Sequence, residues 1–460
     1  MPYLFRQFVP LRAIAFGFGE GVLIFAAVAA GYLLFEDVAA AHDYLLLIAR
    51  GILITSVFQL CLYYFDLYDF SNKQDLYGMA IRITQAWGVA CIVIGFVYVI
   101  VPAVIISTHI FVAVFLLAYG GVLLWRGVYV LTIEHRLFTT RLLVLGSGEQ
   151  AERIVHKIEQ LRDSGYAVIA QVGEGMVPRL TAREAVVYTD TAELNDVVRR
   201  HRIEVVVVAL DDRRGRMPVR QLLECKLAGR DIVNGVSFFE GLTGTILVEN
   251  MSPSWIIFSE GFSRKRMIYL LKRSMDVILS VAGIVISLPV TLASAVIIKL
   301  ESRGKLFYQQ TRVGVGGKPF ELIKFRSMRE DAERDGPVWA VKDDPRVTRY
   351  GAFMRKTRID ELPQLWNILR RDMSFVGPRP ERPEFVQRLE ERIPYYSLRH
   401  SIRPGLTGWA QVRYPYGASE EDALRKLEYD LYYVKNMNVL MDTMIILRTI
   451  KTVLFQKGGR

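Results

Sequence analysis

Four long apolar stretches fill the first third of the chain, at 13–35, 45–65, 83–106 and 108–130. Each is about long enough to cross the roughly 30 Å hydrocarbon core of a bilayer as a helix. The first stretch has no small-residue cleavage site and is followed by further spans, so it indicates a membrane anchor and not a signal peptide. The pattern predicts a bundle of four transmembrane helices over residues 1–138.

Charged residues near the ends of these stretches indicate the orientation of the bundle. Basic residues lie at the N-terminus (Arg6, Arg12), in the second connection (Lys73, Arg82) and after the fourth stretch (Arg136, Arg141). The first connection is acidic and carries Glu36, Asp37 and Asp43. Cytoplasmic loops carry an excess of Lys and Arg, so we expect both ends of the bundle in the cytoplasm. Arg50, near the outer end of the second stretch, does not fit this orientation unless it snorkels.

After the fourth stretch the pattern changes to short β-rich runs that alternate with amphipathic segments, over residues 139–250. Strands are predicted at 141–145, 167–172 and 204–210. The last contains four consecutive valines, which suits a parallel sheet covered on both faces. Alternating strands and helices of this kind predict a Rossmann-like α/β domain.

Gly146, Gly148 and Ala151 form a G-x-G-x-x-A pattern at the start of the first helix of this domain. In Rossmann-like domains such a turn approaches the pyrophosphate of a dinucleotide. An acidic residue about twenty positions later would hold the ribose; the candidate, Glu174, lies between two glycines and past the strand end. We therefore expect a structural turn or a regulatory nucleotide site here, rather than redox catalysis.

A fifth apolar segment, 277–298, is long enough to span a bilayer, yet both of its flanks are basic: Lys272, Arg273, Lys299, Arg303 and Lys305. A true crossing would leave one basic flank outside. Pro289 removes a helical hydrogen bond near the centre, and Ser287 can satisfy freed carbonyls. We expect a broken, re-entrant helix over 274–300; an ordinary fifth span with a proline kink is the alternative.

The segment 251–271 connects the middle domain to this helix. Its aromatic residues Trp255 and Phe258 precede a basic run at 264–266, a combination typical of an interfacial helix on an anionic leaflet. The plain alternative is a linker packed on the sheet.

The composition supports a membrane protein with anionic partners. The 460 residues are 52% hydrophobic and carry a formal net charge of +11. With long apolar stretches, this balance favours anionic lipids and phosphorylated substrates over nucleic acid. Cys61, Cys91 and Cys225 are odd in number and lack metal-ligand spacing, so neither a disulfide framework nor a zinc site is indicated.

Two adjacent carboxylates, Asp360 and Glu361, follow a basic stretch and precede Pro363. Because proline is tolerated only in a first helical turn, the pair is expected at a helix N-terminus, where the dipole favours anions. An anionic nucleophile beside cations, at a site suited to phosphate, indicates phosphoryl transfer. A charged cap on a surface helix is the plain alternative.

The pair belongs to a series of sequence blocks in the last 189 residues: FYQQTRVG at 307–314, KFRSM at 324–328, DELPQ at 360–364, MSFVGPRP at 373–380 and RPGLTGWAQV at 403–412. Together these blocks resemble the bacterial sugar transferase family, the polyprenyl-phosphate hexose-1-phosphate transferases. The resemblance covers 272–460. The whole layout resembles the long members that start exopolysaccharide or O-antigen assembly, and the linker weakly resembles the exosortase-associated subgroup.

This resemblance implies a two-step reaction at Asp360. Asp360 would attack the sugar-bearing phosphorus of a UDP-sugar, release UMP and pass the phosphosugar to undecaprenyl phosphate. It would also be the ligand of a magnesium ion, with Glu361 as base or support. Expected phosphate ligands are Arg355 and Arg379, followed by Lys324, Arg326 and Arg403.

The expected fold is a membrane protein with a four-helix transmembrane bundle, a Rossmann-like α/β middle domain and a mixed, mainly α catalytic domain with a re-entrant membrane helix hairpin. The protein is expected in the bacterial inner membrane with its catalytic domain cytoplasmic. Many relatives have Ser-Pro at the helix break, whereas here Leu288 separates Ser287 from Pro289. A homodimer through the middle domain is a further hypothesis.

Two other functions compete with this one. A membrane-bound, NAD-dependent nucleotide-sugar dehydratase would need a Tyr-x-x-x-Lys pair, and none occurs between Arg141 and Asn250. A non-catalytic assembly scaffold would have no need of the intact Asp360-Glu361 pair. The donor sugar is not specified by any motif; the family resemblance favours glucose or galactose for long members, with N-acetylated sugars as the alternative.

Overall fold

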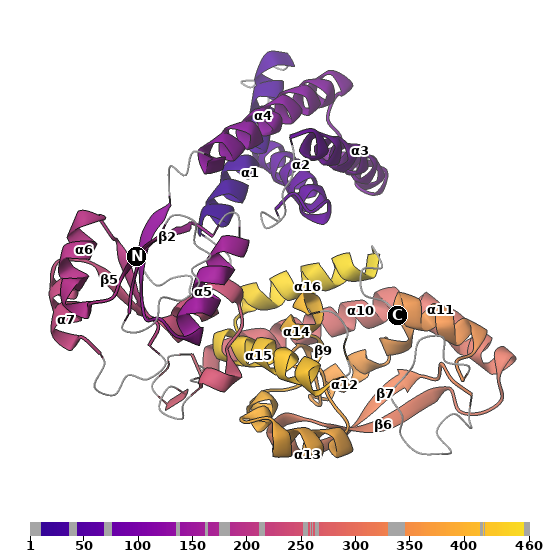
Figure 1. Ribbon diagram of the computed structural model, residues 1–460. Coiled ribbons are helices and arrows are strands. Elements are labelled where there is room, and N and C mark those ends of the chain that lie inside the picture. Colours follow the sequence, from indigo (N-terminus) through magenta and orange to yellow (C-terminus); the bar gives the residue numbers. More distant parts are fainter. Residues whose placement is uncertain are drawn as a thin grey trace. The chain divides into compact units, whose positions relative to one another are not determined.

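A computed structural model describes residues 11–35, 44–68, 76–134, 139–161, 164–173, 185–210, 217–251, 256–257, 259, 261–262, 266–329, 346–414, 417 and 419–454. The chain divides into two compact units, Met1–Leu242 and Thr243–Arg460 (Figure 1). Outside the described residues lie Glu174, nine of the 21 residues of the 251–271 linker, Trp255 and Phe258 among them, and the loop charges Arg6, Lys73, Arg136, Glu36, Asp37 and Asp43.

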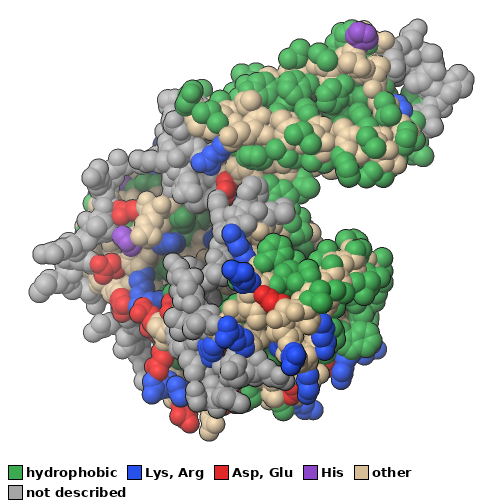
Figure 2. Space-filling model, turned by 90° about the vertical axis from the view of Figure 1, so that its right-hand side faces the viewer, with side chains coloured by type: hydrophobic (Ala, Val, Ile, Leu, Met, Phe, Trp, Pro, Cys, Tyr) green, Lys and Arg blue, Asp and Glu red, His purple; other side chains and the backbone are tan. Residues whose placement is uncertain are grey.

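Four long apolar helices open the first unit: α1 (Leu11–Phe35), α2 (Tyr44–Tyr64), α3 (Leu76–Ile100) and α4 (Thr108–Glu134). All four are long and apolar enough to cross a membrane, which confirms the predicted helices. Helix α1 packs along α4 and α2, and α2 packs along α3. Figure 2 shows hydrophobic side chains over the outer surface of these helices. Because α3 begins at Leu76, Arg82 lies inside it and not in the preceding loop.

A buried ion pair, absent from the sequence-based expectations, joins α1 to α4. Arg126 is 3% exposed and donates to Glu20 through Nε at 2.7 Å and through Nη2 at 2.9 Å. The Leu67 carbonyl accepts from Arg126, and the Tyr68 hydroxyl donates to Glu20. Because each charge has several partners, the desolvation cost of the pair is offset, and we interpret it as a structural fastening.

Arg50, whose position did not fit the predicted orientation, also contacts protein. Its guanidinium donates to the Tyr32 hydroxyl at 3.2 Å and to the Ala103 carbonyl at 3.0 Å. Ala103 belongs to η2 (Pro102–Val104), the short 3-10 helix between α3 and α4. The cation thus fastens this connection to α1 and α2.

The rest of the first unit contains a five-stranded parallel sheet in the order β3-β2-β1-β4-β5. Its strands are β1 (Thr140–Leu145), β2 (Tyr166–Val172), β3 (Val186–Tyr188), β4 (Val205–Val208) and β5 (Asp231–Asn234). Its helices are α5 (Glu149–Gln160), η3 (Thr191–Glu193), α6 (Leu194–Arg200), α7 (Val219–Leu227) and α8 (Gly235–Thr243). The predicted parallel sheet is confirmed.

Side-chain alternation along β1 decides which helices cover which face of the sheet. Leu143 and Leu145 share a core with α6 and α7, whereas Leu142 and Val144 share a core with α5 and α8. Successive residues of a strand point to opposite faces, so one strand supplies both cores. This explains the continuous apolar run that predicted the strand.

The G-x-G turn after β1 is closely packed. Gly146 has φ of 138°, and a Cβ there would lie 2.2 Å from the Ala209 carbonyl oxygen, so only glycine fits. Gln171 donates to the Gly146 carbonyl at 2.6 Å. Gly148 is the N-cap of α5, and Ala151 is fully buried beneath it. These contacts account for the motif by packing, and a nucleotide at this turn stays a prediction.

The second unit is mainly helical. Its helices are η4 (Val248–Asn250), α10 (Arg266–Glu301), η5 (Val315–Gly317), α11 (Arg349–Thr357), η6 (Ile359–Glu361), α12 (Gln364–Leu369), α13 (Pro383–Arg392), η7 (Tyr396–Ser401), α14 (Trp409–Arg413), α15 (Glu420–Asn436) and α16 (Val439–Leu454). The strands β6 (Phe307–Val313) and β7 (Pro319–Phe325) form an antiparallel pair, and β8 (Ser374–Val376) pairs in parallel with β9 (Gly405–Thr407).

Helix α10 contains the fifth apolar segment and is a single helix of 36 residues with Pro289 inside it. The predicted break into two helices is therefore not seen. Ser287 Oγ donates to the Ile284 carbonyl at 3.4 Å, one residue before the Val285 carbonyl that proline leaves unpaired. Because Leu288 separates Ser287 from Pro289, the serine hydroxyl reaches the carbonyl one residue too early to pair with that of Val285.

Both halves of α10 pack on the rest of the second unit. Near its start, Asp276 accepts hydrogen bonds from Ser374 Oγ and the Phe375 amide, at 3.0 and 2.9 Å. Near its end, Ile298 is buried in a core with Phe325 and Met354. The two halves of the helix thus lie against one compact unit.

Candidate active site

The carboxylate pair lies in η6, between α11 and α12. Arg358, which adopts the left-handed conformation (φ 60°, ψ 17°), is both the C-cap of α11 and the N-cap of η6. Pro363 is the N-cap of α12. The prediction of a helix start at the proline is right, but the carboxylates lie in the 3-10 turn before α12 and not in its first turn.

Asp360 is a buried carboxylate with an unpaired oxygen. Its side chain is 7% exposed, and Oδ1 has no hydrogen-bond partner among the described residues. Burial and the neighbouring Glu361 raise the pKa of Asp360 to about 6, although Lys324 opposes this shift. At neutral pH the group is mostly ionised and has an oxygen available for an electrophile or a cation.

Glu361 is surrounded by cations. Its Oε1 lies 3.3 Å from Arg358, 3.6 Å from Arg379 and 3.8 Å from Lys324. Burial alone would raise the pKa of Glu361, but Lys324, Arg379 and Arg358 outweigh it and lower the pKa below its usual value. The two adjacent carboxylates therefore differ: Glu361 is held ionised by cations, while Asp360 is not directly paired.

Three of the five predicted phosphate ligands gather near this pair. Lys324 comes from β7 and Arg379 from the loop after β8, and both contact Glu361. Arg355, on α11, donates to Ser327 Oγ at 3.0 Å and lowers the pKa of Asp360 by its charge. Burial lowers the pKa of Lys324, against the opposing effect of Glu361.

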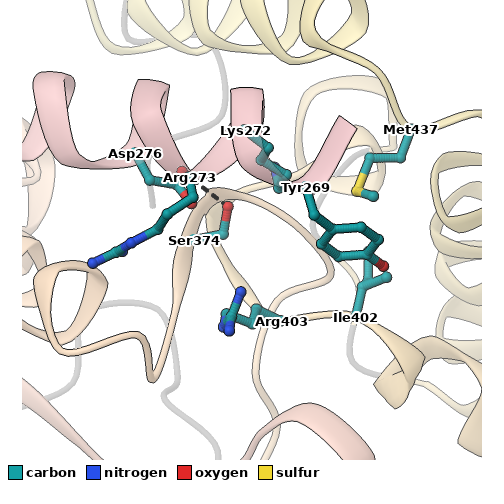
Figure 3. A pocket seen from close by; sticks show the side chains of 8 residues that line it. All are labelled: Tyr269, Lys272, Arg273, Asp276, Ser374, Ile402, Arg403 and Met437. Carbon is teal, nitrogen blue, oxygen red and sulfur yellow. Dashed lines mark hydrogen bonds between the residues drawn. The ribbon is translucent and has the colours of Figure 1, made fainter. Parts of the chain in front are cut away.

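Arg326 and Arg403 are engaged elsewhere. Arg326 is buried and donates to the carbonyls of Ser302 and Arg303, just past the end of α10. Arg403 lies in a pocket whose lining includes neither carboxylate of the pair (Figure 3). Its Nε donates to the Arg371 carbonyl at 3.0 Å. These contacts favour structural roles for both arginines, and phosphate binding by them stays a prediction.

The loop that carries Arg379 is held by two further arginines that the motifs did not single out. Arg399 Nη2 donates to the Arg379 carbonyl at 3.0 Å, and Arg312 Nη1 donates to the Pro380 carbonyl at 2.9 Å. Arg399 is 5% exposed and lies 2.8 Å from Asp430 of α15. We infer that these contacts fix the direction in which Arg379 leaves the backbone.

Arg358 is a cation in contact with Glu361 that sequence reasoning did not assign to phosphate. The signal was present, because residues three apart face each other on a helical turn and Glu361 follows at this spacing. Its left-handed backbone was not foreseeable, since glycine or asparagine usually fills such a C-cap.

The residues around Asp360 fit a magnesium ion only if substrate phosphates and water supply most of its ligands. No group of three or more His, Cys, Asp or Glu side chains that could hold a metal occurs among the described residues. Magnesium, however, is commonly held by one or two carboxylates together with substrate phosphates and water. The unpaired Oδ1 of Asp360 is suited to that manner of binding.

Two family models and several relatives match this chain. The bacterial sugar transferase family matches residues 267–456, and the CoA-binding domain family matches residues 64–225. A UDP-N-acetylgalactosamine-undecaprenyl-phosphate N-acetylgalactosaminephosphotransferase of Aeromonas hydrophila is 41% identical over 262 residues, which are 56% of this chain and 61% of the relative. The chain thus spans less than two thirds of that relative.

Two shorter relatives are covered more fully. A putative undecaprenyl-phosphate N-acetylgalactosaminyl 1-phosphate transferase of Bacillus subtilis is 53% identical over 144 residues, 31% of this chain and 80% of the relative. The exopolysaccharide production protein PSS of Rhizobium leguminosarum is 41% identical over 195 residues, 41% of this chain and 98% of the relative. These identities, with the family match over residues 267–456, lead to one conclusion: the chain belongs to the bacterial sugar transferase family.

Proposed function

We propose that the protein transfers a sugar-1-phosphate from a UDP-sugar to undecaprenyl phosphate, giving undecaprenyl diphosphate sugar and UMP. This would be the first membrane step in the assembly of an exopolysaccharide or O-antigen. The observation that carries the proposal is Asp360, a buried carboxylate with an unpaired oxygen beside cations that meet at Glu361.

In the first step, an oxygen of Asp360 forms a bond to the sugar-bearing phosphorus. The bond from that phosphorus to the bridging oxygen breaks, and UMP leaves with the electron pair. In the second step, a phosphate oxygen of the polyprenyl acceptor attacks the same phosphorus and releases the Asp360 carboxylate. Two displacements suit one soluble and one lipid-held substrate, because they need not meet in the site.

The cations of this chain would stabilise both displacements. Charge accumulates on the peripheral phosphate oxygens in each transition state, and arginine can donate to two of them at once. Arg379 and Lys324 lie on the Glu361 side of the pair, and Arg355 acts on Asp360 from α11. Magnesium held at Asp360 would neutralise part of the diphosphate charge.

We further propose that α10, although continuous through Pro289 in this structure, kinks at that proline in the bilayer, so that it enters the inner membrane from the cytoplasmic side and returns, and the catalytic unit remains cytoplasmic. Two observations support this. Both ends of α10 pack on the same compact unit, and much of its remaining surface is apolar and exposed. The exposed residues include Ile278, Val281, Val285, Ile286, Leu288, Leu292, Val296 and Leu300. Lipid acyl chains are the partners that such a surface fits; a homodimer stays a hypothesis.

The test is UMP release by the full-length protein in detergent micelles. We expect sustained release only with a UDP-sugar, magnesium and undecaprenyl phosphate together. The donor panel should place UDP-N-acetylgalactosamine, whose sugar appears in the names of two of the relatives, beside UDP-glucose and UDP-galactose. Sustained UMP release without the lipid acceptor, or none with any donor of the panel, would contradict the proposal.

A further inference from the structure

Arg358 has a backbone conformation that its residue type disfavours. Its φ of 60° lies in the left-handed region, which carries a steric cost for a non-glycine residue. Glycine would end α11 at this point without that cost. An arginine at this position points to a function for its side chain, because strained backbone positions often occur at functional sites.

The Arg358 side chain lies against η6, the turn that carries Asp360 and Glu361. Its Nη1 donates to Glu361 Oε1 at 3.3 Å, the same oxygen that Lys324 and Arg379 approach. The Arg358 side chain is 44% exposed, whereas that of Glu361 is 11% exposed. One carboxylate oxygen cannot give three cations full hydrogen bonds, so this contact leaves most of the Arg358 donors unused.

The charges around the pair do not cancel. Lys324, Arg355, Arg358 and Arg379 supply four positive charges, and the ionised Asp360 and Glu361 supply two negative charges, which leaves an excess of two. A nucleotide-sugar diphosphate carries two negative charges. The side chains alone, before any magnesium ion is counted, therefore favour an anionic group such as this diphosphate, and an exposed arginine can meet it with two parallel donors.

We propose that Arg358 binds the diphosphate of the nucleotide donor, and that Glu361 holds its guanidinium in place until the donor arrives. This assignment rests on the proposed function and adds a donor-binding residue to it. The guanidinium exchanges a shared carboxylate oxygen for phosphate oxygens, while Lys324 and Arg379 keep Glu361 ionised.

The test is calorimetric titration of full-length protein with UDP, which contains the diphosphate, and with uridine, which has none. Asp360→Asn serves as the background, so that no turnover occurs. We expect Arg358→Gln to weaken UDP binding about tenfold and to leave uridine binding unchanged. Lys356→Gln is the matched control: Lys356 is exposed at the same end of α11 and loses the same charge. It should change UDP binding less than about twofold.

Two more variants separate binding from backbone effects. Arg358→Lys keeps the charge but loses the paired donors, so its UDP affinity should be intermediate. Arg358→Gly relieves the left-handed strain, so its thermal midpoint should be equal or higher while UDP affinity falls as in Arg358→Gln.

The outcomes distinguish the inference from the proposed function. If the background protein binds UDP but Arg358→Gln does so equally well, the assignment of Arg358 is wrong and the proposed function stands. Equal weakening of UDP and uridine binding would also overturn it, by showing an indirect effect. If the background protein binds UDP no better than uridine, the proposed function itself fails.

Discussion

The first turns of α10 are fastened to the catalytic unit by a buried lysine, and this contact gives a quantitative prediction. Lys272 Nζ donates to Asp442 Oδ2 at 2.7 Å, to the Tyr433 hydroxyl at 2.9 Å and to the Val376 carbonyl at 2.9 Å. Lys272 is 6% exposed and Asp442 is 1% exposed. The contact joins α10 to α16, α15 and β8, so its loss should destabilise the whole unit.

Asp442→Leu would leave the ammonium buried with two neutral acceptors. Removing one partner of a buried pair costs about 3 to 5 kcal/mol. For a unit of this size, each kcal/mol lowers the unfolding midpoint by about 2 to 4 °C, so we expect a decrease of roughly 6 to 20 °C. Lys272→Met should cost less, because burial already raises the pKa of Asp442 and its carboxyl can take a proton. The double variant should lose clearly less than the sum of the two.

The assay is thermal unfolding of full-length protein in detergent micelles, with Thr443→Leu as the control. Thr443 is exposed on α16 next to Asp442, so the control should shift the midpoint by no more than about 2 °C. If the two single effects add within about 0.5 kcal/mol in the double variant, Lys272 and Asp442 do not interact and the reasoning is refuted.

Three further predictions concern the site and the bundle. Arg399→Lys should release the Arg379 carbonyl and lower kcat/KM for the UDP-sugar about tenfold, mostly through KM; unchanged steady-state kinetics would refute this. Because the pKa of Asp360 is raised to about 6, the rate of UMP release should rise with pH, reach half its maximum near pH 6 and level off above about 7; a rate independent of pH from about 5 to 8 would exclude Asp360 as the ionised nucleophile. Glu20→Gln should leave Arg126 charged and buried, and thermal unfolding should show a loss of about 3 kcal/mol; an unchanged midpoint would mean that the pair does not fasten the bundle.

The sequence was sufficient for the parts of the protein that depend on period and order. Apolar stretches of membrane length predicted the four helices, and continuous valines predicted the buried strand β4. Lys324 and Arg379 were identified because they lie in sequence blocks that resemble the same family as the block of Asp360, and Arg355 because it lies in the basic stretch just before the pair. Their approach to the pair depends on β7, α11 and the loop after β8, which only the folded unit brings together.

Other contacts could not be read from the sequence, because a cation in a motif has several possible acceptors. Arg326 was expected on phosphate, but it donates to backbone carbonyls past the end of α10. Lys272 was counted as a flank of a membrane segment, whereas its ammonium is buried within protein. Glu20 and Arg126 lie in apolar stretches more than a hundred residues apart, and nothing local shows that they meet.

The central claim is that Asp360 carries the phosphosugar. The most direct measurement is mass spectrometry of full-length protein quenched after brief incubation with magnesium and the UDP-sugar donor, without undecaprenyl phosphate. The account predicts a mass increase of one sugar phosphate on the peptide that contains Asp360, about one UMP released per adduct, and loss of the adduct when the lipid is added. An adduct on another residue, or undiminished transfer by Asp360→Asn, would contradict it.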